Sequence, residues 1–466
     1  MSTRPVIIGG GITGLAAAYE FVNAGVSPIL VEPRPRLGGV IETARVEGCV
    51  LEGGPDSFLS AKPAAAQLLR ELGLGDQIIS SNDHARLTYV VKNGRLIPLP
   101  DGLMMMVPTK IAPVAFSPLL NWSTKIRMGL EFFRKPGNEA FADRSVAEFI
   151  ADHYGREAVD YLAEPLLSGV YGGSVDKLSA ASVLTRFVEM ETKYGSLTKG
   201  TLAAKARAPK NSTPAPLFQT LKGGLQQMVD ALLAKLSGRV EVVQAAAREA
   251  RLEPEGWRVS LEGGETIESR AVVMACPAWN AGTLLRSADA RLAELLQGIE
   301  YSSSLTLALG YNAAECGPIP PGFGFLVPSV ERRKLVACTF IGAKFDFRIP
   351  PDKVVLRCFL GGAGNESVLN ESDEALVETV QQELQQLLGW RRKPAFCRIS
   401  RWPKSMAQYT VGHTRRIDEV TRRANALAGL YLAGNAYDGI GIPDCIRTGR
   451  AAAKQALGAP ASARPA

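Results

Sequence analysis

The sequence is poor in the side chains that most often bind metals. Its 466 residues include three histidines, His84, His153 and His413, and seven cysteines that are widely spaced single residues. Zinc and iron–sulfur sites need several such ligands at short spacing. The sequence therefore predicts no metal site, and it predicts reduced thiols rather than disulfides.

Long apolar runs and a leader segment are also lacking. No run reaches the roughly 18 apolar residues of a membrane-spanning helix. Residues 5–8 already begin an apolar strand, which leaves no room for a signal peptide. We therefore expect a cytoplasmic protein, either free or held peripherally on the cytoplasmic face of the inner membrane.

Acidic residues are fewer than basic ones, 46 against 53, which gives a net charge of +7 and a pI of about 9.0. The basic residues are scattered apart from local runs, so an acidic ligand or a membrane surface is a better match than nucleic acid. The length exceeds what one hydrophobic core comfortably holds, and we expect two or three domains.

The first forty residues carry a dinucleotide-binding pattern. Residues 6–8 are a short apolar strand, Gly9, Gly11 and Gly14 complete G-x-G-x-x-G, and an Ala-rich helix follows. In such a motif the glycines permit a tight turn, the approach of a pyrophosphate and close helix–strand packing. Glu32 ends the next strand, where a carboxylate binds ribose hydroxyls and repels a 2′-phosphate. The pattern predicts FAD or NAD rather than NADP.

Two further glycine turns favour FAD over NAD. Gly38 and Gly39 follow Arg34 and Arg36, and the segment LEGGPDSFLS adds a turn at residues 53 and 54. A flavin dinucleotide lying extended through the protein needs backbone clearance along its length, whereas a nicotinamide site has no evident use for these turns. Ordinary surface turns are the alternative interpretation.

The segment GNAYDGIGIPDCI, residues 434–446, lies between a predicted strand and the last predicted helix. Gly434, Gly439 and Gly441 allow close backbone approach, Pro443 suits the first helical turn, and Gly441 and Ile442 are expected nearest the chemistry. The helix N-terminus would stabilise negative charge on a reduced flavin. Asp444 is interpreted as a helix-stabilising carboxylate rather than an acid catalyst, and Cys445 as packing rather than a nucleophile, since no histidine lies nearby in the segment.

The middle of the chain has a helical texture. Apolar residues recur at helical spacing in residues 119–133, beside basic ones, so this stripe either packs inward, as core or the wall of a substrate channel, or lies on an anionic membrane. Residues 195–216 are basic, rich in small residues and aperiodic, which predicts a mobile loop. Asn93-Gly94 predicts a hairpin over residues 87–100.

Together these patterns predict an α/β protein with a Rossmann-like domain for FAD, and the order of its predicted elements resembles that of a known flavoprotein family, which implies that the domain is discontinuous. That domain comprises residues 1–85, 217–294 and 401–466. A mixed-sheet substrate domain comprises residues 86–100 and 295–400, and an α-helical lobe, with membrane contact as one hypothesis, comprises residues 101–216.

Several of these segments resemble the flavin-dependent amine oxidase superfamily, and in particular its porphyrinogen-oxidising branch. The resemblance runs the length of the chain through GGGITGLA, LGGVIET, GGPDSFL, SGVYGG, KGGLQ, GFGFLVP, QYTVGH and GNAYDGIGIPDCIRTGR. It implies a noncovalent FAD that oxidises a porphyrinogen, protoporphyrinogen IX or coproporphyrinogen III, to the porphyrin. Three hydride transfers to flavin N5 are implied, with O2 reoxidising the flavin to give peroxide.

The resemblance also implies binding roles for individual residues. It implies no catalytic protein side chain, because flavin N5 accepts the hydride. Arg86 would pair a substrate propionate, the Gly169 carbonyl would face the pyrrole N–H groups with Tyr171 close by, and apolar side chains would sandwich the rings. The substrate residues are Arg86, Gly169, Tyr171, Phe323, Leu326 and Phe359. The cofactor residues are Gly9, Gly11, Ile12, Thr13, Gly14, Glu32, Pro33, Arg36, Gly38, Gly39, Gly54, Pro55, Asp56, Ser57, Val242, Trp402, Gly434, Asn435, Gly441, Ile442 and Pro443.

Other readings stay open at this point. Arg34, Arg36 and Lys92 are unranked candidates for a second carboxylate or the cofactor. An amine oxidase or a carotenoid desaturase shares the first motif, although the aliphatic Ile442 stands where amine oxidases place an aromatic residue. A non-catalytic relative that binds prenylated proteins is a third reading. Peripheral membrane contact, a homodimer and hand-over of the product to a chelatase are hypotheses about partners.

Overall fold

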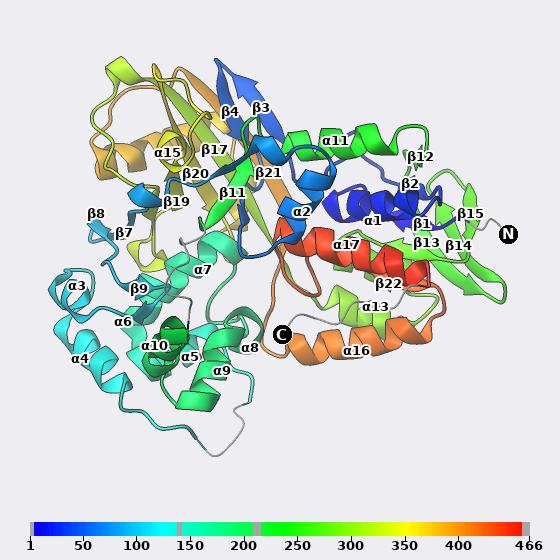
Figure 1. Ribbon diagram of the computed structural model, residues 1–466. Helices are drawn as coiled ribbons and strands as arrows, with labels where there is room; N and C mark the ends of the chain where they lie inside the picture. The colour runs from blue at the N-terminus through cyan, green and yellow to red at the C-terminus, as the bar shows by residue number, and fades with distance from the viewer. Residues whose placement is uncertain (1–3, 138–141, 208–215, 459–466) are drawn as a thin grey trace.

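A parallel five-stranded sheet forms the centre of the nucleotide-binding part. The computed structural model describes residues 4–137, 142–207 and 216–458 (Figure 1). The strand order is β12-β2-β1-β16-β22, and every neighbouring pair is parallel. The strands are β1 (Val6–Ile8), β2 (Ile29–Val31), β12 (Glu241–Val243), β16 (Val272–Met274) and β22 (Leu430–Leu432).

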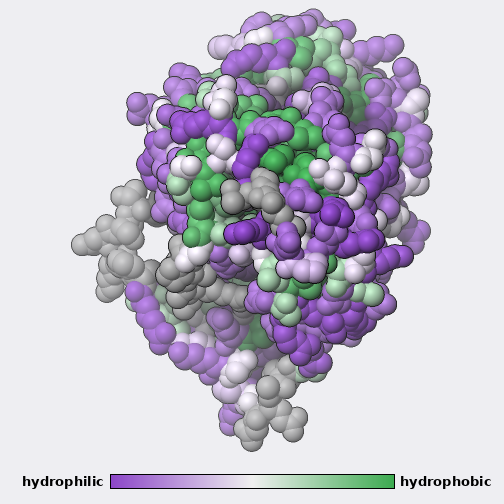
Figure 2. All heavy atoms as spheres, turned by 90° about the vertical axis from the view of Figure 1, so that its right-hand side faces the viewer, coloured by the Kyte–Doolittle hydropathy of each residue, from purple (hydrophilic) through white to green (hydrophobic). Residues whose placement is uncertain are grey.

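Both faces of this sheet are covered at its centre, which explains why β1, β2 and β16 are apolar throughout. Ile7, Leu30 and Val273 face one hydrophobic cluster, together with three helices, α1 (Ile12–Asn23), α11 (Gln226–Leu236) and α17 (Ile442–Ala456). Val6 and Ile8 face the opposite cluster, which is closed by α12 (Ala278–Leu284), α13 (Ala290–Gln297), α16 (His413–Ala426) and a meander of β13 (Ala247–Glu253), β14 (Gly256–Leu261) and β15 (Thr266–Ser269). The side of the molecule on which this meander lies is mostly hydrophilic, with apolar patches in its upper half (Figure 2).

A seven-stranded mixed sheet forms the second part, in the order β21-β17-β20-β19-β18-β7-β8. Only the β18–β7 pair is parallel. α15 (Asp373–Leu388) packs on one face of this sheet. The strands are β7 (Thr88–Lys92), β8 (Arg95–Pro98), β17 (Tyr301–Asn312), β18 (Gly324–Leu326), β19 (Leu335–Phe340), β20 (Lys353–Gly361) and β21 (Phe396–Ala407). The predicted hairpin is confirmed: β7 and β8 are antiparallel around Asn93 and Gly94, both at positive φ.

Small antiparallel pieces connect the two sheets. β3 (Thr43–Val46) pairs with β4 (Cys49–Glu52), and β11 (Phe218–Leu221) pairs with both β5 (Phe58–Leu59) and β6 (Ile78–Ser80). α2 (Ala64–Glu71) packs against α17. The chain therefore crosses repeatedly between the nucleotide-binding sheet and the mixed sheet before and after the helical segment.

A lobe of helices occupies the lower left of Figure 1. Its core is a separate cluster that includes Phe149, Ile150 and Leu162. The elements are β9 (Leu103–Met104), β10 (Val107–Pro108), α3 (Ile111–Phe116), α4 (Trp122–Glu131), α5 (Val146–Tyr154), α6 (Arg156–Ala158), α7 (Glu164–Tyr171), α8 (Ala180–Val183), α9 (Thr185–Tyr194) and α10 (Leu197–Arg207). None of the described helices is long and apolar enough to cross a membrane.

Two predictions for the lobe were wrong. Residues 197–207 form α10 rather than a loop, because Ser196 and the Glu131 carboxylate bind the free N–H groups of its first turn; residues 208–215 lie outside the described residues. Core packing of the apolar stripe also fails over α4 and the residues that follow it, since Trp122, Ile126, Leu130 and Phe133 are exposed, although Leu119 before α4 is buried. Thr124, Met128 and Glu131 form the buried face of α4 instead.

Candidate functional site

The loops that follow three parallel strands meet at one edge of the five-stranded sheet. They are the Gly9–Gly11 turn after β1, Glu32 after β2 and the loop from Gly434 after β22. Ligands of open parallel sheets bind at this carboxyl edge. Gly9 has φ +114°, and a Cβ there would lie 2.7 Å from the Ala275 carbonyl oxygen, so the turn needs glycine.

The surroundings of Gly11 and Gly14 differ in the way that their separate predicted duties require. A Cβ on Gly14 would lie 1.9 Å from the Gly9 carbonyl oxygen, so α1 can pack on the turn only without a side chain there. A Cβ on Gly11 would meet nothing closer than the Gly39 Cα at 3.9 Å, and it points into open space. α1 begins with no side-chain cap and no acidic residue in its first turn. Its N–H groups, beginning with Ile12 and Thr13, fit a pyrophosphate.

Glu32 is buried beside this turn. Its Oε2 accepts a hydrogen bond from the Gly10 N–H (2.7 Å), and its Oε1 accepts from the Arg34 backbone N–H and side-chain Nε, both at 3.1 Å. Arg34 is therefore engaged with the carboxylate that we expect at the ribose. Val242 lies on the neighbouring strand β12, and its side chain is half-exposed. Pro33 follows Glu32 directly.

The second glycine turn is held by Arg36. Its guanidinium donates to the carbonyl oxygens of Gly39 (2.5 Å) and Ile41 (2.7 Å). Gly38 lies next to Gly11, and its N–H donates to the Gly10 carbonyl. Arg36 thus shapes the backbone of the predicted cofactor site, and a substrate carboxylate would have to compete with these two carbonyls for its guanidinium.

The N-terminus of α17 closes the same edge. The Asp444 carboxylate accepts from the Gly441 N–H (3.2 Å) and pairs with Lys62 (2.7 Å). This geometry agrees with the predicted helix-stabilising role. Cys445 is buried, and burial raises the pKa of its thiol to about 11, so it is not a thiolate at neutral pH. Gly434, at φ +131°, has open space where a Cβ would stand.

The Gly53–Ser57 turn links the nucleotide-binding part to the mixed sheet. The Gly53 carbonyl accepts from Thr306 Oγ1 (2.7 Å) and from Trp402 Nε1 (2.8 Å). Asp56 pairs with Lys344 (3.0 Å) and Arg357 (3.6 Å). Burial opposes ionisation of Asp56, but these two cations outweigh it and lower the pKa of its carboxyl group. Asp56 is therefore a fixed anion rather than a proton acceptor.

Two of the predicted substrate residues lie in one row across the mixed sheet. Leu326 on β18 is registered with Ala337 on β19, Ala337 with Phe359 on β20, and Phe359 with Thr306 on β17. Registered residues share a face, so Leu326, Phe359 and the Gly53 turn lie on one side of the sheet. Gly169 on α7 also belongs here, because a Cβ on it would approach Leu326 to 3.8 Å.

The other predicted substrate residues lie around this row. Phe323 precedes β18 and is buried, and its N–H donates to the Leu87 carbonyl; the register does not place it in the row. Tyr171 ends α7, and burial raises the pKa of its hydroxyl group to about 12. Arg86, between a short 3-10 turn and β7, is exposed, and no described side chain pairs with its guanidinium. Lys92 pairs with Glu157 (2.9 Å), which removes it as a free partner for a carboxylate.

Sequence reasoning missed several residues around the Gly53–Ser57 turn. Lys344, Arg348 and Arg357 are buried cations there, and Arg348 pairs with Glu52 (2.8 Å). They come from β20 and from the segment that follows β19. Their acidic partners lie about 300 residues away in the sequence, so no local sequence pattern predicts these pairs.

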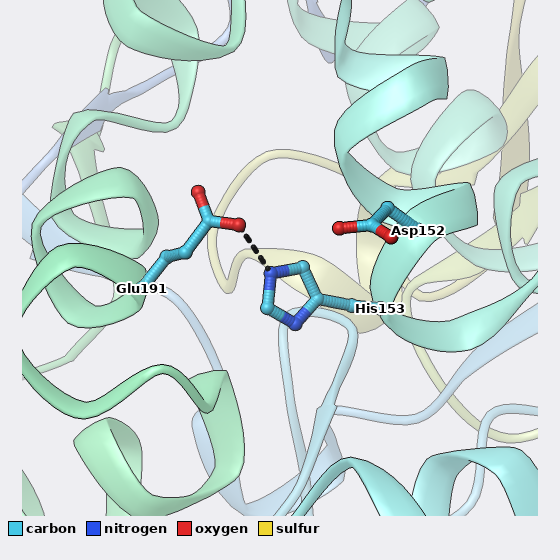
Figure 3. Close-up of side chains that lie close together, drawn as sticks. All are labelled: Asp152, His153 and Glu191. Atoms are coloured by element: carbon cyan, nitrogen blue, oxygen red, sulfur yellow. Dashed lines mark hydrogen bonds and ion pairs between the residues drawn. The ribbon is translucent and has the colours of Figure 1, made fainter. Parts of the chain in front are cut away.

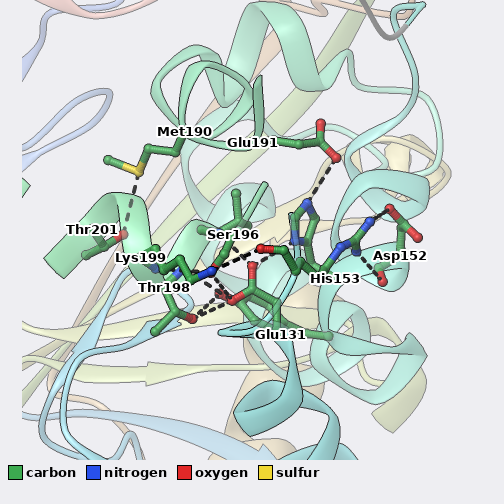
Figure 4. Close-up of polar contacts among 12 residues, drawn as sticks. Glu131, Asp152, His153, Met190, Glu191, Ser196, Thr198, Lys199 and Thr201 are labelled. Carbon is green, nitrogen blue, oxygen red and sulfur yellow. Dashed lines mark hydrogen bonds and ion pairs between the residues drawn. The ribbon is translucent and has the colours of Figure 1, made fainter. Parts of the chain in front are cut away.

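A cluster of charged side chains in the lobe has the residue types of a metal site, but its members pair with other side chains. Asp152, His153 and Glu191 bring ligand atoms within 4.8 Å of one another (Figure 3). However, His153 bonds Glu131 through Nδ1 (2.9 Å) and Glu191 through Nε2 (3.1 Å), which leaves no imidazole lone pair for a metal (Figure 4). Arg134 and Arg144 already pair with Asp152. The cluster is an ion-pair network that joins α4, α5 and α9.

The sheet edge, its glycine turns and the two helix N-termini define a dinucleotide-binding protein. Residues 12–457 match the family described as flavin containing amine oxidoreductase, and the chain belongs to that family. The fold class predicted from the sequence is confirmed. Since a flavin bound on a dinucleotide fold is FAD, the cofactor is FAD, and the uncapped α1 and the open side of Gly11 fit its pyrophosphate.

Named relatives lie in one branch of that family. The chain is 35% identical to the coproporphyrinogen III oxidase of Bacillus subtilis (strain 168), covering 97% of both chains. It is 29% identical to protoporphyrinogen oxidase 1, chloroplastic, of Arabidopsis thaliana, covering 96% of this chain and 86% of that protein. A crystal structure from Exiguobacterium sp. 255-15, solved as a candidate protoporphyrinogen oxidase, superposes with a TM-score of 0.87 at 32% identity, covering 98% of each chain.

Proposed function

We propose that the protein oxidises a porphyrinogen to the porphyrin. The observation that carries the proposal is the near full-length identity of 35% with a coproporphyrinogen III oxidase. The site supports it, because Gly169, Leu326 and Phe359 lie on the face of the mixed sheet that meets the Gly53–Ser57 turn. A porphyrinogen is apolar apart from its carboxylates, and an apolar sheet face suits its macrocycle.

Bound FAD supplies the hydride acceptor, and the protein binds and orients the substrate. Leu326 and Phe359 give the macrocycle apolar contact, while the Gly169 carbonyl faces the pyrrole N–H groups. Arg86 binds a propionate, since a guanidinium pairs with a carboxylate through two parallel hydrogen bonds. The N–H groups of the first turn of α17 stabilise negative charge at the cofactor.

O2 is the proposed electron acceptor, with one peroxide released for each of three two-electron steps. Aerobic reaction of the purified holoenzyme with coproporphyrinogen III and with protoporphyrinogen IX tests both the activity and the substrate. Porphyrin fluorescence and peroxide should appear together, faster with coproporphyrinogen III, because the relative named for it has the higher identity. Turnover of neither compound would end the proposal, and faster turnover of protoporphyrinogen IX would reverse the substrate order.

We also propose that the exposed apolar face of α3 and α4 rests on an anionic membrane. Ile111 is 87% exposed, Phe116 84%, Phe133 70% and Trp122 64%, and Lys110 and Lys125 lie on the same two-helix segment. Apolar side chains beside lysines are typical of helices that lie in the membrane interface. The predicted homodimer and the hand-over to a chelatase stay predictions.

Vesicles that contain phosphatidylserine test this surface. The protein should sediment with them, less so at high salt, and a Trp122→Ser, Phe133→Ser double variant should stay in the supernatant. Phe347→Ser is the matched control, because Phe347 is also exposed but lies outside the lobe. Absence of sedimentation by the unmodified protein would contradict the proposal.

A further inference from the structure

The segment Gln408–His413 follows β21 and lies where three parts of the chain meet. Leu178, beyond the end of α7, bridges to Thr410, and Ser179 N–H donates to the Tyr409 carbonyl (2.7 Å). Gln408 and Tyr409, which begin this segment, have buried side chains with different partners. One holds the helical lobe, and the other holds the loop that leads into α17.

Tyr409 bridges the loop between β22 and α17. Its hydroxyl group donates to the Asn435 carbonyl (2.9 Å) and accepts from the Gly439 N–H (2.9 Å). One hydroxyl thus ties two backbone groups across the loop whose glycines are predicted to seat the flavin. The ring itself is fixed by stacking on His413, with centroids 4.0 Å apart and an interplanar angle of 12°.

Gln408 holds the end of α7 on the opposite side. Its Nε2 lies 2.8 Å from the Tyr171 carbonyl oxygen and 2.9 Å from Ser302 Oγ. The contact leaves no space for a side chain at residue 173, because a Cβ on Gly173 would come within 2.0 Å of Gln408 Oε1. The position of α7, and with it that of Gly169, is therefore fixed against β17 and the end of β21.

We propose that Gln408 and Tyr409 are positioning residues that set the two sides of the reaction site from adjacent places in the chain. Tyr409 fixes the flavin-side loop, and Gln408 fixes the substrate-side helix. Neither is proposed to touch the reacting atoms. The role of Gln408 rests on the proposed porphyrinogen oxidation, whereas the role of Tyr409 rests only on FAD.

Tyr409→Phe tests the flavin side, because it keeps the stacked ring and removes only the bridging hydroxyl. FAD should dissociate from the holoenzyme about tenfold more readily, as expected for the loss of buried hydrogen bonds, with little change in KM. Tyr437→Phe is the matched control, since the buried Tyr437 hydroxyl in the same loop has no hydrogen-bond partner among the described residues. It should release FAD as the unmodified protein does.

Gln408→Met tests the substrate side, because methionine has a similar length but donates no hydrogen bond. KM for coproporphyrinogen III should rise several-fold while FAD release stays within about twofold of the unmodified protein. A residue that only supported folding would lower thermal stability in both variants without this split. If the unmodified protein turns over no porphyrinogen, the proposed function fails. FAD release from the two variants then still shows whether Tyr409, and not Gln408, holds the flavin-side loop.

Three results would overturn the proposal. In the first, Tyr409→Phe releases FAD no faster than the unmodified protein. In the second, Tyr437→Phe releases FAD as fast as Tyr409→Phe, and in the third, Gln408→Met loses its FAD. If Tyr409→Phe does not fold, hydrogen exchange of the unmodified holoenzyme replaces it. The Gly439 amide should then be protected through its bond to Tyr409, and rapid exchange at that amide would contradict the bridge.

Discussion

The nucleotide-binding sheet and the helical lobe use polar and apolar groups in opposite ways. In the sheet, apolar strands and helices fill both faces, and polar backbone groups are left at one edge for a ligand. In the lobe, ionisable side chains such as Glu131 and His153 are buried, while the apolar face of α4 is exposed. The first region is shaped by close backbone packing, the second by side-chain pairs between distant helices.

The strongest test of this difference is Gly14→Ala in the sheet region. Its Cβ would stand 1.9 Å from the Gly9 carbonyl oxygen, so α1 must move away from the turn. We expect a destabilisation of more than about 2 kcal/mol and a preparation largely free of FAD. Thermal unfolding and the flavin absorbance of the purified protein measure both effects. Retention of full FAD content would show that the turn is not packed as described.

A second test removes the imidazole from the lobe. His153→Leu leaves Glu131 and Glu191 without their shared partner, and we expect a loss of about 3 kcal/mol in the unfolding transition of the lobe. FAD content should not change. His84→Leu, at an exposed position, is the control. Equal stability of His153→Leu and the unmodified protein would mean that the network contributes nothing.

The pH dependence of that effect has a defined sign. Burial lowers the pKa of His153, but its hydrogen bonds to the Glu131 and Glu191 carboxylates outweigh burial and raise the pKa above 6.5. The stabilisation is therefore complete below pH 6.5 and is lost as the pH rises through the raised value. The pKa values of Glu131 and Glu191 are lowered below 4.5 despite burial, so their contribution is lost only as the pH falls through the lowered values. Arg134, Arg144 and Asp152 are the other charged groups of this network.

The difference in stability between the unmodified protein and His153→Leu should accordingly be largest near pH 6 and shrink toward alkaline pH. Urea unfolding at a series of pH values measures it. A difference that grows with pH would show that His153 is neutral in the folded protein.

A third test concerns Arg86, which lies between a short 3-10 turn and the first strand of the mixed sheet. Arg86→Ala should raise KM about tenfold and leave kcat within about twofold, because a propionate contact is made equally in the ground and transition states. Arg95→Ala, on the hairpin that follows Arg86 and also exposed, should change neither constant. A larger fall in kcat than rise in KM would assign Arg86 a different role.

The smallest effect is expected from a glycine-to-alanine substitution in the lobe, at Gly129. A Cβ on Gly129, in the exposed part of α4, would meet nothing within 4 Å. Gly129→Ala should therefore stabilise the lobe by about 0.5–1 kcal/mol, the reverse of Gly14→Ala. Thermal unfolding measures the sign, and destabilisation would show that α4 packs against something on that side.

The sequence predicted the sheet region well because its constraints are local. The Gly9 turn, the open side of Gly11 and the packing of Gly14 follow from spacing within one strand–turn–helix unit. The hairpin at Asn93-Gly94 is local in the same sense. The discontinuous order of the sheet, with β16 and β22 far along the chain, came from the resemblance.

The lobe and the Gly53–Ser57 turn were less predictable, because the side chains that pair there are distant in the sequence. Periodicity predicted that α4 is amphipathic, but which face is buried depends on Glu131 binding His153 and the first turn of α10. The ion pairs of Asp56 with Lys344 and Arg357 join residues nearly 300 positions apart. Lys92 looked free in sequence because its partner, Glu157, belongs to another element.

The most direct test of the proposed function is an anaerobic single turnover. Holoenzyme mixed with coproporphyrinogen III in the absence of O2 should lose its flavin absorbance near 450 nm on the order of seconds or faster, since typical turnover numbers lie at or above 1 per second. Admission of O2 should then restore the absorbance and complete porphyrin formation. A flavin that stays oxidised in the presence of excess coproporphyrinogen III and of protoporphyrinogen IX would contradict the assignment.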